Sequence, residues 1–297
     1  MVTSSEIVEW FKGLQDDICK NLETLDGEGV FHEDKWDRPE GGGGRSRVIQ
    51  GKHIEKGGVM FSAVDGKMPE AVAKGLGLPA NEFLATGVSI VLHPHNPHVP
   101  IIHMNVRYFE TSTGEWWFGG GIDVTPHYID EQAAQEFHRK LKIACDPLGP
   151  AIYEEYKIWA DNYFFNEHRK ETRGIGGIFF DRLNESKGFR KEDIWTFVQR
   201  VGETFVPAYK ELFQNGFEKP FTKTEQQWQY VRRGRYVEFN LVYDRGTKFG
   251  LQTNGRIESI LMSMPPDASW PYNLAPASGS AEEATQGLLI KGIDWLN

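Results

Sequence analysis

The chain of 297 residues has only two cysteines, Cys19 and Cys145, which lie far apart in the sequence. Two such residues provide no disulfide framework, so the composition indicates a reducing compartment. Apolar runs of membrane-spanning length are also missing. The first segment carries acidic residues where a signal or transit peptide would be basic. We therefore expect a cytoplasmic protein that does not insert into a membrane.

The chain is short of basic residues, with 33 Lys and Arg against 42 Asp and Glu and a net charge of −9. This balance argues against nucleic acid or an anionic membrane as the main partner. An anionic small molecule remains compatible, because a local group of arginines can oppose the overall sign. Disordered linkers are lacking, and the hydrophobic content of 39% supports a substantial core. We expect a single domain over residues 1–297.

The densest chemistry lies between His93 and Asp123. Side chains alternate along a strand, so a strand over residues 101–109 would place His103, Asn105 and Arg107 on one face. The other face of this strand would be apolar and would pack on the core. The strand expected at residues 87–93 repeats the pattern, with Ser89 and His93 on one face. These polar rows predict a binding or catalytic site.

Three glycines, Gly119 to Gly121, follow an aromatic segment and precede Asp123. Glycine lacks a Cβ, so a flat ligand can approach the backbone there; a bulge or a corner in a sheet is the structural alternative. The apolar neighbours of Asp123 indicate a partly desolvated carboxylate. Its structural alternative is to cap the turn into Thr125-Pro126.

Hydrophobic periodicity and turn residues predict the other elements. We expect helices at residues 7–25, 69–76, 130–145, 152–165, 194–212, 223–232 and 282–290. We expect strands at residues 48–50, 59–64 and 236–244, a loop at 41–44, and a hairpin over 251–262 that turns at Asn254-Gly255. Strands in runs with helices grouped between them predict an α+β fold, with a large and mostly antiparallel sheet flanked by helices.

The sequence resembles the aerobic (oxygen-dependent) coproporphyrinogen-III oxidases over nearly its whole length. The matching segments are His93-Pro94, Val99 to Arg107, Trp116 to Gly121, His168-Arg169, Arg173 to Gly177, Phe179 to Asp181, Tyr236 to Thr247, Gly250 to Thr253 and Glu258 to Pro266. The resemblance implies oxidative decarboxylation of two propionates of coproporphyrinogen III to vinyl groups in haem biosynthesis. The products would be protoporphyrinogen IX, carbon dioxide and hydrogen peroxide, with molecular oxygen as acceptor and no cofactor required. It also implies a homodimer, with its interface within residues 236–271.

The resemblance also implies roles for individual residues. His103 would be the acid, Asp123 would face the pyrrole nitrogens, and Arg107 would act beside them. The implied substrate contacts are Ser89, Asn105, Val106, Arg107, Asp244, Arg245 and the turn Asn254-Gly255-Arg256. Asn254 departs from the family pattern, which has glycine there, although asparagine also tolerates left-handed backbone conformations. Arg107 and Arg256 would hold substrate carboxylates through charge-assisted hydrogen bonds.

Two other interpretations stay open at this point. A divalent ion, accessory or catalytic, would use His93, His103, His138 and His168. Against it, Pro94 and Pro97 interrupt the strand, and no cysteine or carboxylate stands at ligand spacing. The third interpretation is a noncatalytic tetrapyrrole carrier, which needs the arginines but not Asp123.

Overall fold

The computed structural model describes residues 2–79, 81–252 and 255–297. The helices are α1 (Ser4–Asp26), α2 (Glu70–Leu76), α3 (Glu131–Cys145), α4 (Ile152–Tyr163), α5 (Lys191–Gln214), α6 (Lys223–Val242), α7 (Arg245–Gln252), α8 (Ile257–Leu261) and α9 (Ala281–Gly287). The strands are β1 (His32–Asp37), β2 (Gly42–Ile49), β3 (Ile54–Lys67), β4 (Glu82–Pro94), β5 (Ile101–Thr111), β6 (Trp116–Thr125), β7 (Phe165–Asn166), β8 (Glu171–Thr172) and β9 (Gly176–Leu183).

Within these residues, seven strands form one antiparallel sheet in the order β1-β2-β3-β4-β5-β6-β9. Neighbouring strands in the sheet are mostly consecutive in the chain; the short helix α2 lies between β3 and β4, and α3, α4, β7 and β8 lie between β6 and β9. The predicted α+β fold with a large antiparallel sheet flanked by helices is confirmed. In the described residues, no helix is both long and apolar enough to cross a membrane.

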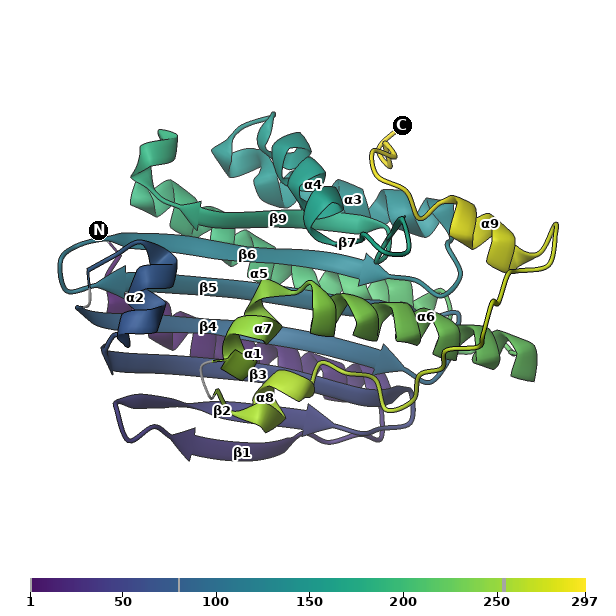
Figure 1. Ribbon diagram of the computed structural model, residues 1–297, viewed down its shortest axis with the longest axis horizontal. Helices are drawn as coiled ribbons and strands as arrows, with labels where there is room; N and C mark the ends of the chain where they lie inside the picture. The colour runs from purple at the N-terminus through teal and green to yellow at the C-terminus, as the bar shows by residue number, and fades with distance from the viewer. Residues whose placement is uncertain (1, 80, 253–254) are drawn as a thin grey trace.

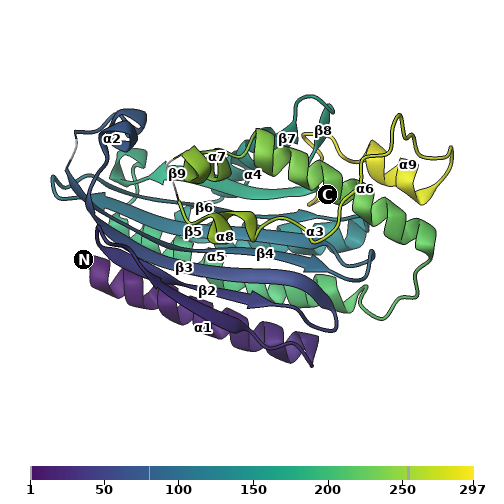
Figure 2. The same cartoon turned by 60° about the horizontal axis from the view of Figure 1, so that its bottom comes forward.

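One face of the sheet is apolar and carries the main core. Alternating residues of β5, including Ile102, Met104 and Val106, are fully buried there. Figure 2 shows α1 and α5 lying along this side of the sheet. Helix α1 begins with a capping box of Thr3 and Glu6 and ends at Gly27 in the left-handed conformation. Its apolar stripe joins the sheet residues in one continuous core.

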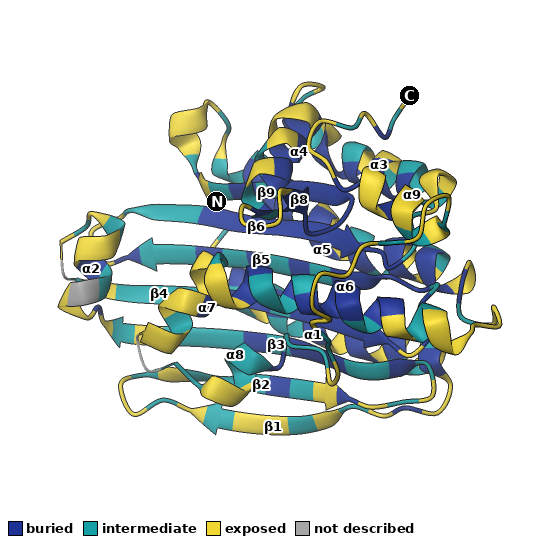
Figure 3. Ribbon diagram, turned by 45° about the vertical axis from the view of Figure 1, so that its right-hand side comes forward, coloured by how far each residue is buried: buried dark blue, intermediate teal, exposed yellow. Residues whose placement is uncertain are grey.

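The other face of the sheet carries the polar row of β5. Helices α6, α7 and α8 lie across the middle of this face (Figure 1). Figure 3 shows that the central strands are largely buried, whereas α7 and α8 carry exposed positions. The sheet therefore separates the buried apolar core, on the side of α1 and α5, from a partly exposed polar layer on the side of α6, α7 and α8.

Three local predictions are wrong. Residues 236–244 were predicted as a strand, but α6 continues through Val242, because Tyr236, Phe239 and Asn240 share one buried helical side. The segment predicted as a hairpin over 251–262 contains the end of α7 and the short helix α8. Its turn residue Asn254 lies outside the described residues. The glycines at 42–44, predicted as a loop, belong to β2, because glycine fits where Trp36 of β1 packs over Gly44.

Candidate functional site

The sheet register brings the predicted polar residues into adjacent rows. Ser89 of β4, Asn105 of β5 and Gly121 of β6 are opposite one another, and His103 is opposite Asp123. Directly opposite residues in an antiparallel pair point to the same face, so these side chains share the face below α6 to α8. Val106, another predicted contact, is fully buried on the opposite face. A contact from Val106 to a ligand on the polar face would therefore have to use its backbone.

Arg107 lies at one end of the polar row. Its guanidinium donates to Asn105 Oδ1 at 2.7 Å and to Asp181 Oδ1 at 2.8 Å. The side chain of Arg107 is 39% exposed and that of Asp181 is 32% exposed, so the pair faces open space rather than the core. Arg107 is thus positioned to meet an anionic group that approaches this face, with Asp181 as its partner in the structure described.

His103 and Asp123 form a closer pair in the middle of the sheet. His103 Nδ1 lies 2.8 Å from Asp123 Oδ1, and both Asp123 oxygens lie 2.7 Å from Arg173 Nη2. Asp123 is only 2% exposed, as the apolar neighbours predicted, while His103 is 21% exposed. Burial alone would raise the pKa of Asp123, but the charge of Arg173 and the hydrogen bond from His103 lower it below its usual value. The carboxylate is therefore ionised.

Arg173 has no role in the sequence-based prediction, although it stands in a segment that carries the family resemblance. It is fully enclosed, with its guanidinium 4.3 Å from the Phe164 ring centroid and 4.7 Å from that of Phe239. A single arginine before a glycine-rich segment gives no periodic signal, and its carboxylate partner is 50 positions away in the chain. Only the long-range register of the sheet brings the two together.

Asp244 and Arg245 both contact Tyr163 of α4, which lies beside the polar face. Asp244 accepts hydrogen bonds from the Tyr163 hydroxyl at 2.9 Å and from the Thr247 amide at 2.7 Å. The Arg245 guanidinium lies 5.4 Å from the Tyr163 ring centroid. Tyr163 in turn stacks on Phe179 of β9, with ring centroids 4.1 Å apart. Both predicted residues therefore border the site, and Asp244 also holds the start of α7.

Arg256 lies over the β1–β2 side of the same face. It donates to the Ser46 and Ser259 hydroxyls at 3.1 Å each and forms an ion pair with Asp34. Gly255, the neighbouring predicted residue, donates its amide to the carbonyl of Gly250 at 2.8 Å. The predicted contacts thus spread across one face of the sheet rather than gathering at one point.

The four histidines proposed for a metal do not form a common site. His93 is fully buried and its Nε2 lies 2.9 Å from the Ser263 carbonyl. His138 is also fully buried, between the Tyr153 hydroxyl and the Ile175 carbonyl. His168 is exposed and contacts Glu238. The described part of the chain contains no group of three or more His, Cys, Asp or Glu side chains suited to a metal ion.

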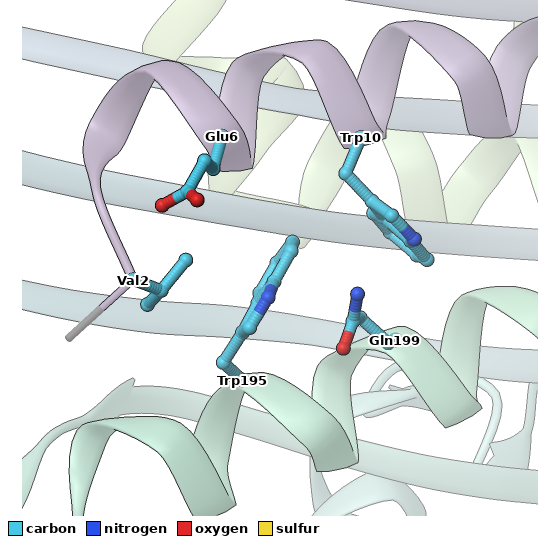
Figure 4. Close-up of a pocket in the computed structure, with 5 residues that line it drawn as sticks. All are labelled: Val2, Glu6, Trp10, Trp195 and Gln199. Carbon is cyan, nitrogen blue, oxygen red and sulfur yellow. The ribbon is translucent and has the colours of Figure 1, made fainter.

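Two hollows lie away from the polar face. One of about 470 Å³ is lined by Val2, Glu6, Trp10, Trp195 and Gln199. Figure 4 shows that these residues come from the start of the chain, α1 and α5, on the apolar side of the sheet. Another, of about 320 Å³, lies near the start of α3 and the end of α5. Neither hollow is lined by a predicted site residue, so the polar face remains the candidate site.

The candidate site is thus one face of an antiparallel sheet that carries a buried Asp123–Arg173 pair, a partly exposed His103 and a partly exposed Arg107. Comparison with family models gives a match to "Coproporphyrinogen III oxidase" over residues 6–295. The chain belongs to this family. Membership places it among the oxidoreductases of haem biosynthesis that act on coproporphyrinogen III.

Proposed function

We propose that this enzyme uses molecular oxygen to convert two propionates of coproporphyrinogen III to vinyl groups, giving protoporphyrinogen IX. For each propionate, –CH2CH2CO2⁻, O2 and H⁺ become –CH=CH2, CO2 and H2O2. The bond between the carboxyl carbon and its CH2 breaks and its electron pair forms the C=C bond, while the CH2 attached to the ring loses a hydrogen together with its bonding pair, and oxygen accepts these two electrons. The observation that carries the proposal is the row of His103, Asn105 and Arg107 on one partly exposed face of the sheet.

The residues on this face can divide the work as follows. Arg107 binds a propionate carboxylate, since a guanidinium matches a carboxylate with two parallel hydrogen bonds. Arg256, two strands from Ser89 across the sheet, binds another carboxylate of the same macrocycle. His103 transfers a proton, a role that suits imidazole because its ordinary pKa is close to neutral. Removal of a pyrrole proton makes the ring electron-rich enough to reduce oxygen directly, so no resident metal or organic cofactor is invoked.

The test is turnover of coproporphyrinogen III under air, under nitrogen, and under air after treatment with a chelator. We expect protoporphyrinogen IX to form only with oxygen, at a rate that chelation does not change. Equal turnover under nitrogen would contradict the oxygen-dependent reaction. Activity that disappears with chelation and returns only with iron or copper would contradict the metal-free reaction. Tight substrate binding without any product would instead indicate a carrier.

We further propose that the enzyme is a cytoplasmic homodimer that associates through residues 236–271. Apolar side chains of α6, α7 and α8 in this segment are exposed, among them Leu241 (45%), Val242 (50%), Leu251 (42%) and Ile257 (59%). Exposed apolar residues that are close together are typical of protein interfaces. Sedimentation that shows only a monomer at micromolar concentration would rule this arrangement out.

A further inference from the structure

The surroundings of Asp123 assign it a different role from direct contact with the substrate. Its two oxygens receive contacts from His103 Nδ1 at 2.8 Å, from Arg173 Nη2 at 2.7 Å twice, and from Arg173 Nε at 3.2 Å. An ionised carboxylate has about four lone-pair sites in its plane. Three nitrogens of the protein itself therefore engage both oxygens of Asp123, which is buried away from the open part of the face.

Arg173 is held just as firmly. Three aromatic rings surround its guanidinium, with centroid distances of 4.3 Å to Phe164, 4.8 Å to Tyr236 and 4.7 Å to Phe239. Its Nη1 donates to Asn240 Oδ1 at 2.9 Å. Phe164 follows α4, while Tyr236, Phe239 and Asn240 belong to α6. Residues from two separate helices therefore fix the orientation of the Arg173 guanidinium. The buried pair cannot separate without leaving two uncompensated charges away from water.

This arrangement dictates which nitrogen of His103 carries a proton. A carboxylate accepts hydrogen bonds only, so Nδ1 must be the donor at 2.8 Å from Asp123. Arg173 Nη2 also lies near Nδ1, but at 3.5 Å this contact is too long to compete. Nδ1 is engaged by buried Asp123, while the His103 side chain as a whole is still 21% exposed. A partner on one ring nitrogen fixes the state of the other, and here it leaves Nε2 for the substrate.

We propose that Asp123 and Arg173 are positioning residues, which act on the substrate through the orientation and tautomer of His103. Arg173 keeps Asp123 ionised and in place, and Asp123 holds Nδ1–H so that Nε2 exchanges the proton of the reaction. The inference rests on the proposed function of His103 and replaces the predicted direct contact between Asp123 and the pyrrole nitrogens. Asp181, which is partly exposed on the same face and ion-paired with Arg107, is a carboxylate that a ligand on this face can reach more readily than Asp123.

The variant Asp123→Asn separates this role from direct contact. Arg173 will hold the amide oxygen, which turns the NH2 group toward His103. Nδ1 then has to accept a hydrogen bond, and the proton moves to Nε2. Nitrogen-15 NMR of labelled histidine distinguishes the two tautomers without any turnover. We expect the wild type to carry the proton on Nδ1 and the variant to carry it on Nε2, with kcat lowered by about 10²-fold or more and KM changed less than about threefold.

Two further variants are controls. Arg173→Lys retains the charge, so we expect it to keep the wild-type tautomer and to lose less kcat than Asp123→Asn. In a His103→Gln background, Asp123→Asn should lower kcat only slightly further, because the residue through which Asp123 acts is already gone.

Three results would overturn the proposal: wild-type His103 with its proton on Nε2, an unchanged tautomer in Asp123→Asn, or a full additional loss of kcat in the His103→Gln background. If Asp123→Asn fails to fold, the wild-type spectrum alone still tests the proposal, because it shows which nitrogen of His103 carries the proton. If the protein lacks oxidase activity, the spectra still report the tautomer of His103. Failure of the proposed function can therefore be told apart from failure of this inference.

Discussion

Gly119 lies where any side chain would strike the polar row. A Cβ at this position would be 2.7 Å from Asp181 Oδ1 and 2.8 Å from Arg107 Nε. The sequence suggests that the three glycines let a flat ligand approach the backbone. The structure gives a more specific reason at Gly119, because the missing side chain makes room for the ion pair of Arg107 and Asp181.

The variant Gly119→Ala should therefore impair the site and not the fold. The atoms it strikes are the ends of two flexible side chains, which can move away. We expect KM to rise several-fold, because Arg107 is displaced, and the melting temperature to change little. The matched control is Gly120→Ala, whose Cβ points to the opposite face, 2.5 Å from the Asn105 carbonyl and 2.9 Å from the Phe180 ring. That variant should lose roughly 1–3 kcal/mol of stability through overpacking. Equal loss of stability in the two variants would contradict the distinction.

The sequence predicts the position of some site residues but not of others. Alternation along β5 was sufficient to place His103, Asn105 and Arg107 on one face, because a strand has only two faces. The pairing of Asp123 with Arg173 was not predictable in the same way. It depends on β9 adding beside β6 and on α6 closing over the guanidinium, and neither contact leaves a local pattern.

At the scale of elements, α6 explains the main error. Residues 236–244 alternate apolar and polar side chains, which is typical of a strand. The same residues place Tyr236, Phe239, Asn240 and Tyr243 three or four positions apart, which is typical of a helix side. No proline separates the segment from the helix that begins at Lys223, and the single Gly234 is accommodated inside that helix, so the helix continues. Leu241 and Val242, in the last turn of this helix, are exposed.

Helix α8 is fixed to the sheet by contacts at both ends. Arg256 joins it to Asp34 and Ser46, and Lys56 donates to the carbonyl of Met264 at 2.7 Å. Between them, Met262 packs where a Cβ on Gly58 would lie. Arg256 can therefore either bind substrate, as predicted, or only hold the helix in place.

Removal of each partner separates these roles. If Arg256 binds a substrate carboxylate, Arg256→Ala should raise KM roughly tenfold or more, since a charge-assisted bond contributes about 1.5–3 kcal/mol. Asp34→Ala should leave KM unchanged or lower it, because it frees the guanidinium from a competing carboxylate. Steady-state kinetics on both variants is the measurement. Similar increases of KM in the two would show that Arg256 serves α8 alone.

At the scale of the whole molecule, buried histidines couple the fold to pH. Burial is the main cause that lowers the pKa of His93 and of His138 to about 3, and burial also lowers the pKa of His127 well below its ordinary value. These imidazoles are neutral in the folded protein, whereas in the unfolded chain they gain protons below about pH 6.5. The unfolded state therefore binds more protons between about pH 6.5 and 3, and the stability present above this window is lost as the pH falls through it.

We expect the free energy of unfolding to fall by about 1.4 kcal/mol per pH unit for each such histidine inside this window. Urea unfolding at a series of pH values measures the slope. The variant His138→Gln retains a polar side chain between the Tyr153 hydroxyl and the Ile175 carbonyl but cannot titrate. This variant should be less stable than the wild type at neutral pH. Its free energy of unfolding should, however, fall less steeply with decreasing pH, and the difference in slope should equal the contribution of one histidine. A wild-type slope in this variant would mean that His138 takes up its proton in the folded protein, and that its burial does not exclude the charge.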